Sequence, residues 1–258
     1  MTLPKSLTLL HTNDFHNHLT SAQAAFIEAE KAKHENVLLL DAGDAISAGN
    51  VGVRPGGEPI LSLMSETGYE AMTLGNREFH VADMLLRLKL SKAAFPILSA
   101  NIRWRDDKGE RLPTVPSLKK TLPNGLRVAV FGLSVPMVTP RMTARLVSAF
   151  VFDDPVQSAK AQIACLRSGA DVLIALTHIG LREDERLAAA CPELDLIVGG
   201  HSHNKLYAPP VVNSVPIVQA GWFGHFLGET VLTVSEPGAK LAVTGRLMEL
   251  PDGKEARK

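Results

Sequence analysis

Residues 7–16 read LTLLHTNDFH, a short apolar run that passes directly into residues able to bind a metal ion. A leucine-rich run of this length predicts a buried strand over residues 7–11. Asp14 and His16 follow the run at a spacing of two, so their side chains point the same way. We therefore expect the first strand to end in a pair of metal ligands.

Four later apolar runs end in the same manner. The sequence DAGD follows the run 37–40, GNREFH follows 71–74, GGHSH follows 195–198, and the run 171–177 ends at His178. The carboxyl ends of parallel strands lie along one edge of a sheet, so segments that are distant in sequence can deliver ligands to one crevice. The recurrence of such side chains at strand ends predicts a metal centre.

Short strand-like runs alternate with longer amphipathic stretches along the chain, which is the pattern of an α/β fold with crossover helices. The predicted strands are 7–11, 37–40, 71–74, 96–99, 127–133, 171–177 and 195–198. The predicted helices are 21–33, 58–66, 81–92, 155–168 and 182–190. Ser21 and Asp154 are the expected caps of two of these helices, and Pro155 suits a first helical position.

After Val198 the pattern changes to turns and alternating runs. Antiparallel strands that close a second sheet are predicted at 211–220, 228–234 and 242–250. No linker rich in Gly, Ser or Pro divides the chain, so residues 1–250 are expected to form one domain. Residues 251–258 form a charged C-terminal tail that we expect to fray.

The composition excludes several classes of partner. The 258 residues are 45% hydrophobic and 21% charged, as in an ordinary globular protein. Lys plus Arg and Asp plus Glu each number 27, so no basic face is expected to bind nucleic acid as a bulk partner. No apolar stretch approaches the roughly 20 residues that cross a bilayer, so we expect no membrane partner. The run 7–10 is too short for the core of a signal peptide, which favours a cytoplasmic location; a periplasmic or secreted one is expected only if a leader has been removed.

The candidate ligands at the strand ends are two carboxylates, one amide oxygen and four imidazoles. They are Asp14, His16, Asp44, Asn76, His178, His201 and His203. Such a set is too large for one tetrahedral ion, but it suits two ions that share a bridging carboxylate. Nitrogen and oxygen donors without cysteine favour Mn, Fe, Zn or Co, and the sequence leaves the choice open. Two divalent cations and two aspartates leave a charge of about +2, which matches a phosphoryl dianion.

Five ordered motifs carry a family resemblance. They are His11-Thr-Asn-Asp-Phe-His, Asp41-Ala-Gly-Asp, Leu74-Gly-Asn-Arg-Glu-Phe, Ala175-Leu-Thr-His and Gly199-Gly-His-Ser-His. They resemble the motifs of the calcineurin-like metallophosphoesterases. Within that superfamily the chain is most similar to the N-terminal catalytic domain of the 5′-nucleotidase and UDP-sugar hydrolase family, and the similarity extends nearly to the end of the chain.

The resemblance implies a four-layered α/β/β/α sandwich and a division of the ligands between two metals. One metal would take Asp14, His16, Asp44 and His203, and the other would take Asp44, Asn76, His178 and His201. Two ions about 4 Å apart can bind a hydroxide, lower its pKa and hold phosphoryl oxygens for in-line attack. The implied function is a phosphatase or phosphodiesterase that hydrolyses small, nucleotide-derived phosphate esters or anhydrides by attack of metal-bound hydroxide.

The third motif departs from the family pattern, which is Gly-Asn-His-Glu-Phe-Asp. Arg77 and His80 replace a His that protonates the leaving oxygen or stabilises phosphoryl charge and an Asp that orients that His. Arg77 stays charged near neutral pH, so it can contact phosphoryl oxygens but cannot act as a general acid. We expect a preference for good leaving groups, as in anhydrides or aryl phosphates, with His80 as a candidate replacement acid. The UDP-diacylglucosamine pyrophosphatases also carry Arg at this place and cleave an anhydride.

Family members usually carry a C-terminal domain whose aromatic residues sandwich the nucleobase, and we expect no such domain here. Either the substrate is small, the activity is broad, or a partner chain supplies the pocket. Asn101 and His225 join Arg77 as candidate substrate contacts, although His225 could instead donate to neighbouring backbone. The alternative function is a catalytically weak metal-binding subunit that needs a partner chain for substrate recognition. Apolar surface left by the missing domain would also favour a homodimer.

Structural roles compete with some of these assignments. Asp14 and Asp44 could be turn formers or helix caps, because aspartate often has those roles. Arg77 could form a structural salt bridge with Glu78 or Asp41. The recurrence of all five motifs in order favours the metal centre over these separate explanations.

Overall fold

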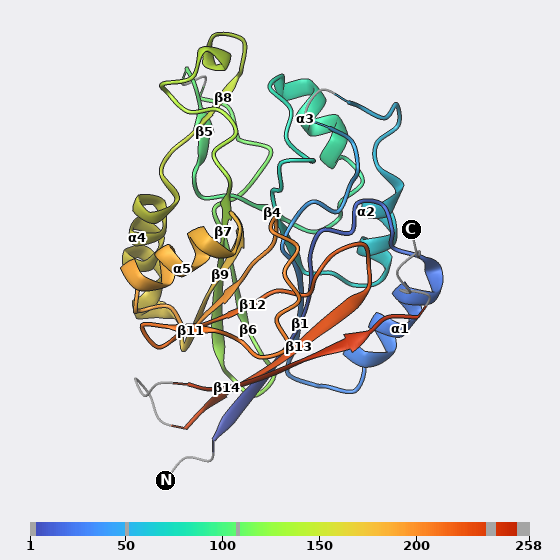
Figure 1. The fold of residues 1–258 in the computed structure, drawn as a ribbon, viewed down its shortest axis with the longest axis vertical. Helices are drawn as coiled ribbons and strands as arrows, with labels where there is room; N and C mark the ends of the chain where they lie inside the picture. The colour runs from blue at the N-terminus through green and yellow to red at the C-terminus, as the bar shows by residue number, and fades with distance from the viewer. Residues whose placement is uncertain (1–3, 50–51, 107–108, 236–240, 252–258) are drawn as a thin grey trace.

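The structure is a computed structural model that describes residues 4–49, 52–106, 109–235 and 241–251. Two mixed sheets pack face to face, and helices cover their outer faces (Figure 1). The strands are β1 (Lys5–Thr12), β2 (Val37–Asp41), β3 (Ala71–Thr73), β4 (Ile97–Leu98), β5 (Ile102–Trp104), β6 (Ser117–Thr121), β7 (Arg127–Ser134), β8 (Phe150–Phe152), β9 (Val172–His178), β10 (Leu196–Val198), β11 (Val211–Val212), β12 (Val215–Val218), β13 (Phe226–Val234) and β14 (Ala242–Glu249). The helices are α1 (Ser21–Lys31), α2 (Pro59–Glu66), α3 (Asp83–Leu90), α4 (Pro155–Leu166) and α5 (Leu181–Ala190), with 3-10 turns at Thr143–Leu146 and Arg167–Gly169.

The first sheet has the strand order β14-β13-β1-β2-β3-β4. Strands β1 to β4 are parallel, with Leu9 opposite Leu38. The other side of β1 pairs antiparallel with β13, where Leu7 lies opposite Leu232, and β14 pairs antiparallel with β13. The prediction that the runs 228–234 and 242–250 close a second sheet is therefore wrong. They extend the first sheet, because β1 offers them its otherwise unpaired side.

The second sheet has the order β11-β12-β10-β9-β7-β6. Strands β7, β9, β10 and β12 are parallel, and β6 and β11 add antiparallel edges. The run 211–220 is thus a short hairpin of β11 and β12, and only its first half is antiparallel to the sheet. Strands β5 and β8 form a separate two-stranded sheet.

Alternate residues of each central strand face different cores, as the period of two requires. Leu7 and Leu9 of β1 pack with Ile174 of β9 between the two sheets. Leu10 points to the opposite face, where it shares a cluster with Ile27 of α1. On the far side of the second sheet, the strand residues pack against α4 and α5 in a third cluster. The order helices, sheet, sheet, helices confirms the predicted α/β/β/α sandwich.

The predicted strands before Val198 and the predicted helices are confirmed to within two residues at each end. The cap of α1 is Thr20 and not Ser21. Thr20 Oγ1 accepts the N–H of Gln23 at 3.2 Å, and Gln23 Oε1 accepts the N–H of Thr20 at 2.8 Å. This reciprocal pair is a capping box. Asp154 caps α4 as predicted, since its Oδ1 accepts the N–H of Gln157 at 2.9 Å.

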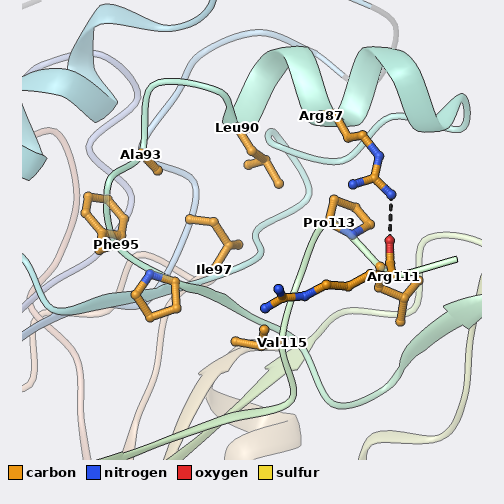
Figure 2. A pocket seen from close by; sticks show the side chains of 10 residues that line it. Arg87, Leu90, Ala93, Phe95, Ile97, Arg111, Pro113 and Val115 are labelled. Atoms are coloured by element: carbon orange, nitrogen blue, oxygen red, sulfur yellow. Dashed lines mark hydrogen bonds between the residues drawn. The ribbon is translucent and has the colours of Figure 1, made fainter.

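Among the described residues, the helices are all too short or too polar to span a bilayer. Residues 252–258, most of the predicted tail, lie outside the described residues. A pocket of 370 Å³ lies between α3 and the segment 111–115 (Figure 2). At its rim Arg87 donates a hydrogen bond of 2.6 Å to the carbonyl of Arg111. None of the predicted site residues lines this pocket.

Candidate metal centre

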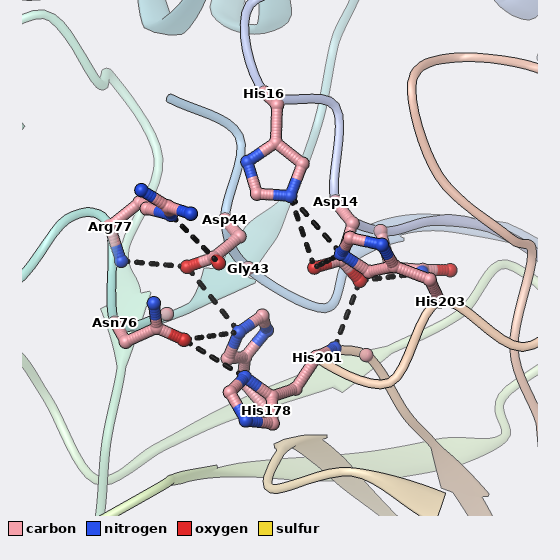
Figure 3. A network of polar contacts seen from close by, with 12 residues as sticks. Asp14, His16, Gly43, Asp44, Asn76, Arg77, His178, His201 and His203 are labelled. Atoms are coloured by element: carbon pink, nitrogen blue, oxygen red, sulfur yellow. Dashed lines mark hydrogen bonds and ion pairs between the residues drawn. The ribbon is translucent and has the colours of Figure 1, made fainter. Parts of the chain in front are cut away.

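The predicted ligands lie at the carboxyl ends of strands from both sheets. In the first sheet β1, β2 and β3 lead into ligand-bearing loops, and in the second sheet β9 and β10 do the same. Because β3 contacts both β7 and β9, these ends adjoin across the sandwich. The structure brings together Asp14, His16, Asp44, Asn76, His178, His201 and His203 (Figure 3).

Asp14, His16 and His203 form the first ligand cluster, in which one ligand atom of each residue lies within 4.8 Å of the others. Asp14 Oδ1 is 3.7 Å from His16 Nε2 and 3.2 Å from His203 Nε2. Asp14 is fully buried, and within the described residues no hydrogen bond reaches this oxygen. A buried carboxylate oxygen without a hydrogen bond is costly unless a cation compensates it.

Asp44, His178 and His201 form the second ligand cluster. His178 Nε2 lies 3.3 Å from Asp44 Oδ1. Asn76 Oδ1 lies 3.3 Å from the same imidazole nitrogen and 2.9 Å from His201 Nδ1. Asp14 Oδ2 accepts the backbone N–H of His201 at 2.9 Å, so one hydrogen bond joins the two clusters.

The tautomer of His178 is fixed by the backbone. Its Nδ1 lies 2.6 Å from the carbonyl oxygen of Ala42, which can only accept a hydrogen bond. Nδ1 therefore carries a proton, and Nε2 points toward Asp44 and Asn76 as the ligand atom. Burial lowers the pKa of His178, but the Asp44 carboxylate outweighs it and raises the pKa to about 10.

Most candidate ligands adopt the left-handed backbone conformation. Positive φ occurs at Asp14 (54°), His16 (46°), Asp44 (56°), His201 (75°) and His203 (58°). Each such residue other than glycine costs roughly 1–3 kcal/mol, so it persists only where the surrounding fold imposes it. The clustering of this strain at five candidate ligands indicates that the surrounding fold imposes the backbone conformation that directs these side chains.

Two glycines let the loops approach closely enough to form the clusters. A Cβ at Gly200 would lie 2.6 Å from the Ala42 carbonyl oxygen and 3.0 Å from His178 Nδ1. A Cβ at Gly43 would lie 2.9 Å from the backbone nitrogen of Gly75 and from the carbonyl oxygen of Thr73. Since real Cβ contacts below 3.0 Å are essentially absent, these sites need glycine for the close approach.

The donor set suits divalent cations. It combines carboxylate and amide oxygens with imidazole nitrogens, which are the ligands of Zn, Mn, Fe and Co. The Asp14 Oδ1, which among the described residues accepts no hydrogen bond, and the close approach of His16 Nε2 and His203 Nε2, at 3.2 Å, mark the place where a cation would sit in the first cluster. The residues present therefore fit the metal chemistry that the sequence predicts.

Arg77 reaches the second cluster. Its backbone N–H donates to Asp44 Oδ1 at 2.7 Å, and its Nε lies 3.9 Å from Asp44 Oδ2. The side chain of Arg77 remains 44% exposed, so the guanidinium stays accessible to a substrate. Within the described part of the chain its ion pair is with Asp44 and not with Glu78 or Asp41, the partners that a structural role would have used.

His80 lies in the same loop, and it belongs to neither of the ligand clusters found among the described residues. It is buried, and its Nδ1 accepts the N–H of Ala82 at 2.9 Å. Burial and the nearby charge of Lys89 lower the pKa of His80. The neutral ring therefore carries its proton on Nε2. Its role as a replacement acid stays a prediction.

The two other candidate substrate contacts lie in different surroundings. Asn101 is buried, and its amide bonds the backbone of Ser134 in both directions, at 2.9 and 2.8 Å. His225 is half-buried with its ring 5.5 Å from that of Trp222, and its backbone N–H donates to Trp222. Substrate contact by either residue stays a prediction.

Sequence reasoning missed two residues that hold the ligands. Asn13 donates to Asp14 Oδ2 at 2.7 Å and accepts the N–H of Ala220 at 2.7 Å. Glu78 is buried and accepts backbone N–H groups of Asp44 at 3.0 Å and Gly75 at 2.9 Å. Burial and the charge of Asp44 raise the pKa of Glu78 to about 7. Both residues stand inside the quoted motifs, next to or close to a predicted ligand. That position in the sequence could have identified them as residues that support the ligands.

Residues 7–205 match the family described as calcineurin-like phosphoesterase. The chain belongs to this family. The resemblance found in the five motifs is thereby confirmed, together with the prediction of a metal-dependent phosphoesterase. Enzymes of this family use divalent metals, and the two ligand clusters are the candidate sites for them.

Named relatives cover most of this chain. The 5′-nucleotidase of Diplobatis ommata is 33% identical over 271 residues, which are 89% of this chain and 46% of the relative. The trifunctional nucleotide phosphoesterase protein YfkN of Bacillus subtilis (strain 168) is 30% identical over 284 residues, which are 95% of this chain and 19% of YfkN. The crystal structure of a 5′-nucleotidase precursor from Thermus thermophilus superposes with a TM-score of 0.80 at 28% identity, over 96% of this chain and 55% of that one. The chain spans about half the length of these 5′-nucleotidases.

Proposed function

We propose that the chain hydrolyses small, nucleotide-derived phosphate esters or anhydrides at a centre of two divalent cations. One cation would be held by Asp14, His16, Asp44 and His203, and the other by Asp44, Asn76, His178 and His201. The observation that carries the proposal is the fully buried Asp14, whose Oδ1 faces two imidazole nitrogens without a hydrogen bond from the described residues. The names of the relatives, 5′-nucleotidase and nucleotide phosphoesterase, support the nucleotide-derived substrate.

The chain's own groups hold the ligands in place for this chemistry. When bound, the cations would supply Lewis acidity, which lowers the pKa of a water nucleophile and offsets charge on phosphoryl oxygens. The Ala42 carbonyl keeps Nε2 of His178 turned toward Asp44. The N–H of His201 and the amide of Asn13 both bond Asp14 Oδ2, which leaves Oδ1 beside the imidazole nitrogens of the first cluster as the ligand atom.

Arg77 is the proposed contact for the phosphoryl group. Its accessible guanidinium beside Asp44 can donate two parallel hydrogen bonds to phosphoryl oxygens. It cannot protonate a leaving alkoxide near neutral pH, so turnover would favour leaving groups that need little protonation. We therefore propose a preference for anhydrides and aryl phosphates over alkyl monoesters, with His80 as the candidate acid for poor leaving groups.

The proposal is tested with purified chain loaded with Mn²⁺. Turnover of p-nitrophenyl phosphate, bis-p-nitrophenyl phosphate, UDP-glucose and AMP should depend on the metal and stop with a chelator. Asp44→Asn should abolish it, because Asp44 would serve both cations. Glu183→Gln is the matched control, since its partly exposed carboxylate pairs with Arg186 and lies outside both ligand clusters.

Each outcome separates the possible functions. Metal-independent turnover, or full activity in Asp44→Asn, would reject the binuclear hydrolase. Bound metal without turnover of any substrate would favour a metal-binding subunit that needs a partner chain, an alternative consistent with the chain's coverage of about half of its 5′-nucleotidase relatives. A strong preference for AMP would reject the leaving-group argument alone.

A further inference from the structure

Lys89, near the end of α3, is a lysine with only 1% of its surface exposed. Its Nζ donates to the carbonyl oxygens of Arg77 at 2.7 Å, Gly49 at 3.1 Å and Phe79 at 3.2 Å. A lysine ammonium has three N–H donors, so each is used on the backbone. Lys89 therefore joins the loop after β3, which carries Arg77, to the loop after β2, which carries Asp44.

Lys89 occupies a buried position where lysine is rarely found, and carboxylates lie near its ammonium group. Burial lowers the pKa of Lys89, and the carboxylates of Glu78, Glu58 and Asp44 oppose that effect. Arg77 is the nearby cation that adds to the lowering. A charged donor binds carbonyl oxygens more strongly than a neutral one, so these contacts hold the loop firmly.

Position 80 does not hold Arg77. In the family pattern an Asp at this position orients the residue at position 77. Here His80 Nδ1 is bonded to Ala82, and within the described residues no hydrogen bond joins His80 to Arg77. The approach of the Arg77 guanidinium to Asp44 thus depends on the backbone of residues 77–79, and Lys89 bonds that backbone at both ends.

We propose that Lys89 is a positioning residue that holds the backbone of Arg77 so that its guanidinium faces the phosphoryl group at the metal centre. The inference rests on the proposed function, in which Arg77 contacts phosphoryl oxygens. The Lys89 ammonium holds the loop by its backbone carbonyls, whereas His80 is bonded to Ala82. The third carbonyl, of Gly49, fixes the same loop relative to the segment that follows Asp44.

A double-mutant cycle tests this role. Lys89→Met keeps a similar length but removes the charge and all three donors. It should lower kcat for p-nitrophenyl phosphate by roughly 10- to 100-fold, the scale of a displacement near 1 Å at a reacting group. In an Arg77→Met background the same substitution should cost almost nothing more, because the residue that it positions is gone. If Lys89→Met lowers kcat by the same factor in the Arg77→Met background as in wild-type protein, the proposal is overturned. Wild-type kcat in Lys89→Met or in Arg77→Met would also overturn it.

Measurements other than turnover separate positioning from general damage. Calorimetry with inorganic phosphate on the Mn²⁺-loaded protein should show weaker binding in Lys89→Met and Arg77→Met, to a similar extent, while the Mn²⁺ content per chain stays at the wild-type value. Lys92→Met, an exposed lysine just after α3, is the control and should match wild type. Unchanged phosphate binding in Lys89→Met would also overturn the proposal.

A milder substitution covers the case in which Lys89→Met does not fold. Lys89→Arg keeps the charge with a planar head, so it should lose less kcat than a variant without charge, and that loss should likewise vanish in the Arg77→Met background. If it persists there, Lys89 is a structural residue only. Absence of turnover by wild-type protein would reject the proposed function. If wild-type protein is active but the effects of the Lys89 and Arg77 substitutions on kcat are independent, only the role of Lys89 is rejected.

Discussion

Gly200 stands where the loops after β10 and β2 meet, and it leaves no room for a side chain. In Gly200→Ala the new methyl group would lie 2.6 Å from the Ala42 carbonyl oxygen, while ordinary contact begins at 3.4 Å. The carbonyl must therefore retreat by about 0.8 Å, and overpacking of this kind costs about 1–3 kcal/mol. That carbonyl orients His178, so its displacement reaches a metal ligand directly.

We expect two effects of Gly200→Ala. The free energy of unfolding, measured in urea, should fall by about 1–3 kcal/mol. Turnover of p-nitrophenyl phosphate should fall by roughly 100-fold, because a ligand moves by nearly 1 Å. Gly169→Ala is the matched control, since a Cβ there meets no atom within 4 Å and its φ is not positive. Wild-type stability, Mn²⁺ content and turnover in Gly200→Ala would refute the idea that this close approach sets the ligand geometry.

Two further predictions concern stability. Burial raises the pKa of Asp184 to about 8 from 3.8, so the unfolded chain loses this proton at lower pH than the folded chain. The free energy of unfolding of metal-free protein should therefore fall as pH rises from about 4 to 8, by up to about 1.4 kcal/mol per pH unit from this group. In urea titrations at several pH values, Asp184→Asn should make this dependence on pH weaker. An equal dependence in wild type and variant would contradict the assignment. Bound Mn²⁺ should stabilise the folded protein by about 2.7 kcal/mol at a free concentration one hundred times Kd, seen as a rise in Tm that a chelator reverses and that Asp14→Asn removes. A Tm that ignores both metal and chelator would argue against an ion at Asp14.

The ligand side chains were predictable from the sequence because two signals coincide. The apolar runs 7–11 and 171–177 mark strands, and polar residues such as Asp14 and His178 follow them at once. Parallel strands place their carboxyl ends together, so the position in the chain already implied proximity in space. The structure adds what the runs do not contain, namely the distances and the hydrogen bonds that orient each ligand.

Other features depend on contacts that no local pattern reveals. Periodicity indicates that 228–234 is a strand, but not that the unpaired side of β1 accepts it. Strand β6 escaped prediction because Lys119 and Lys120 give it the composition of an exposed edge. Lys89 has the appearance of a solvated helix residue, and its burial follows only from the positions of two loops distant in sequence.

The pairing of β1 with β13 constrains the order in which parts of the protein can fold during synthesis. Asp14 and His16 follow strand β1, and one side of β1 pairs with β13, which ends at Val234. On the ribosome, β1 can pair with β2 early, but its other side stays open until β13 has been made. His203 of the first cluster is also made well after Asp14 and His16. The first ligand cluster can therefore form only after residue 203 has been made, and a shorter nascent fragment carries the first motif without its partner imidazole.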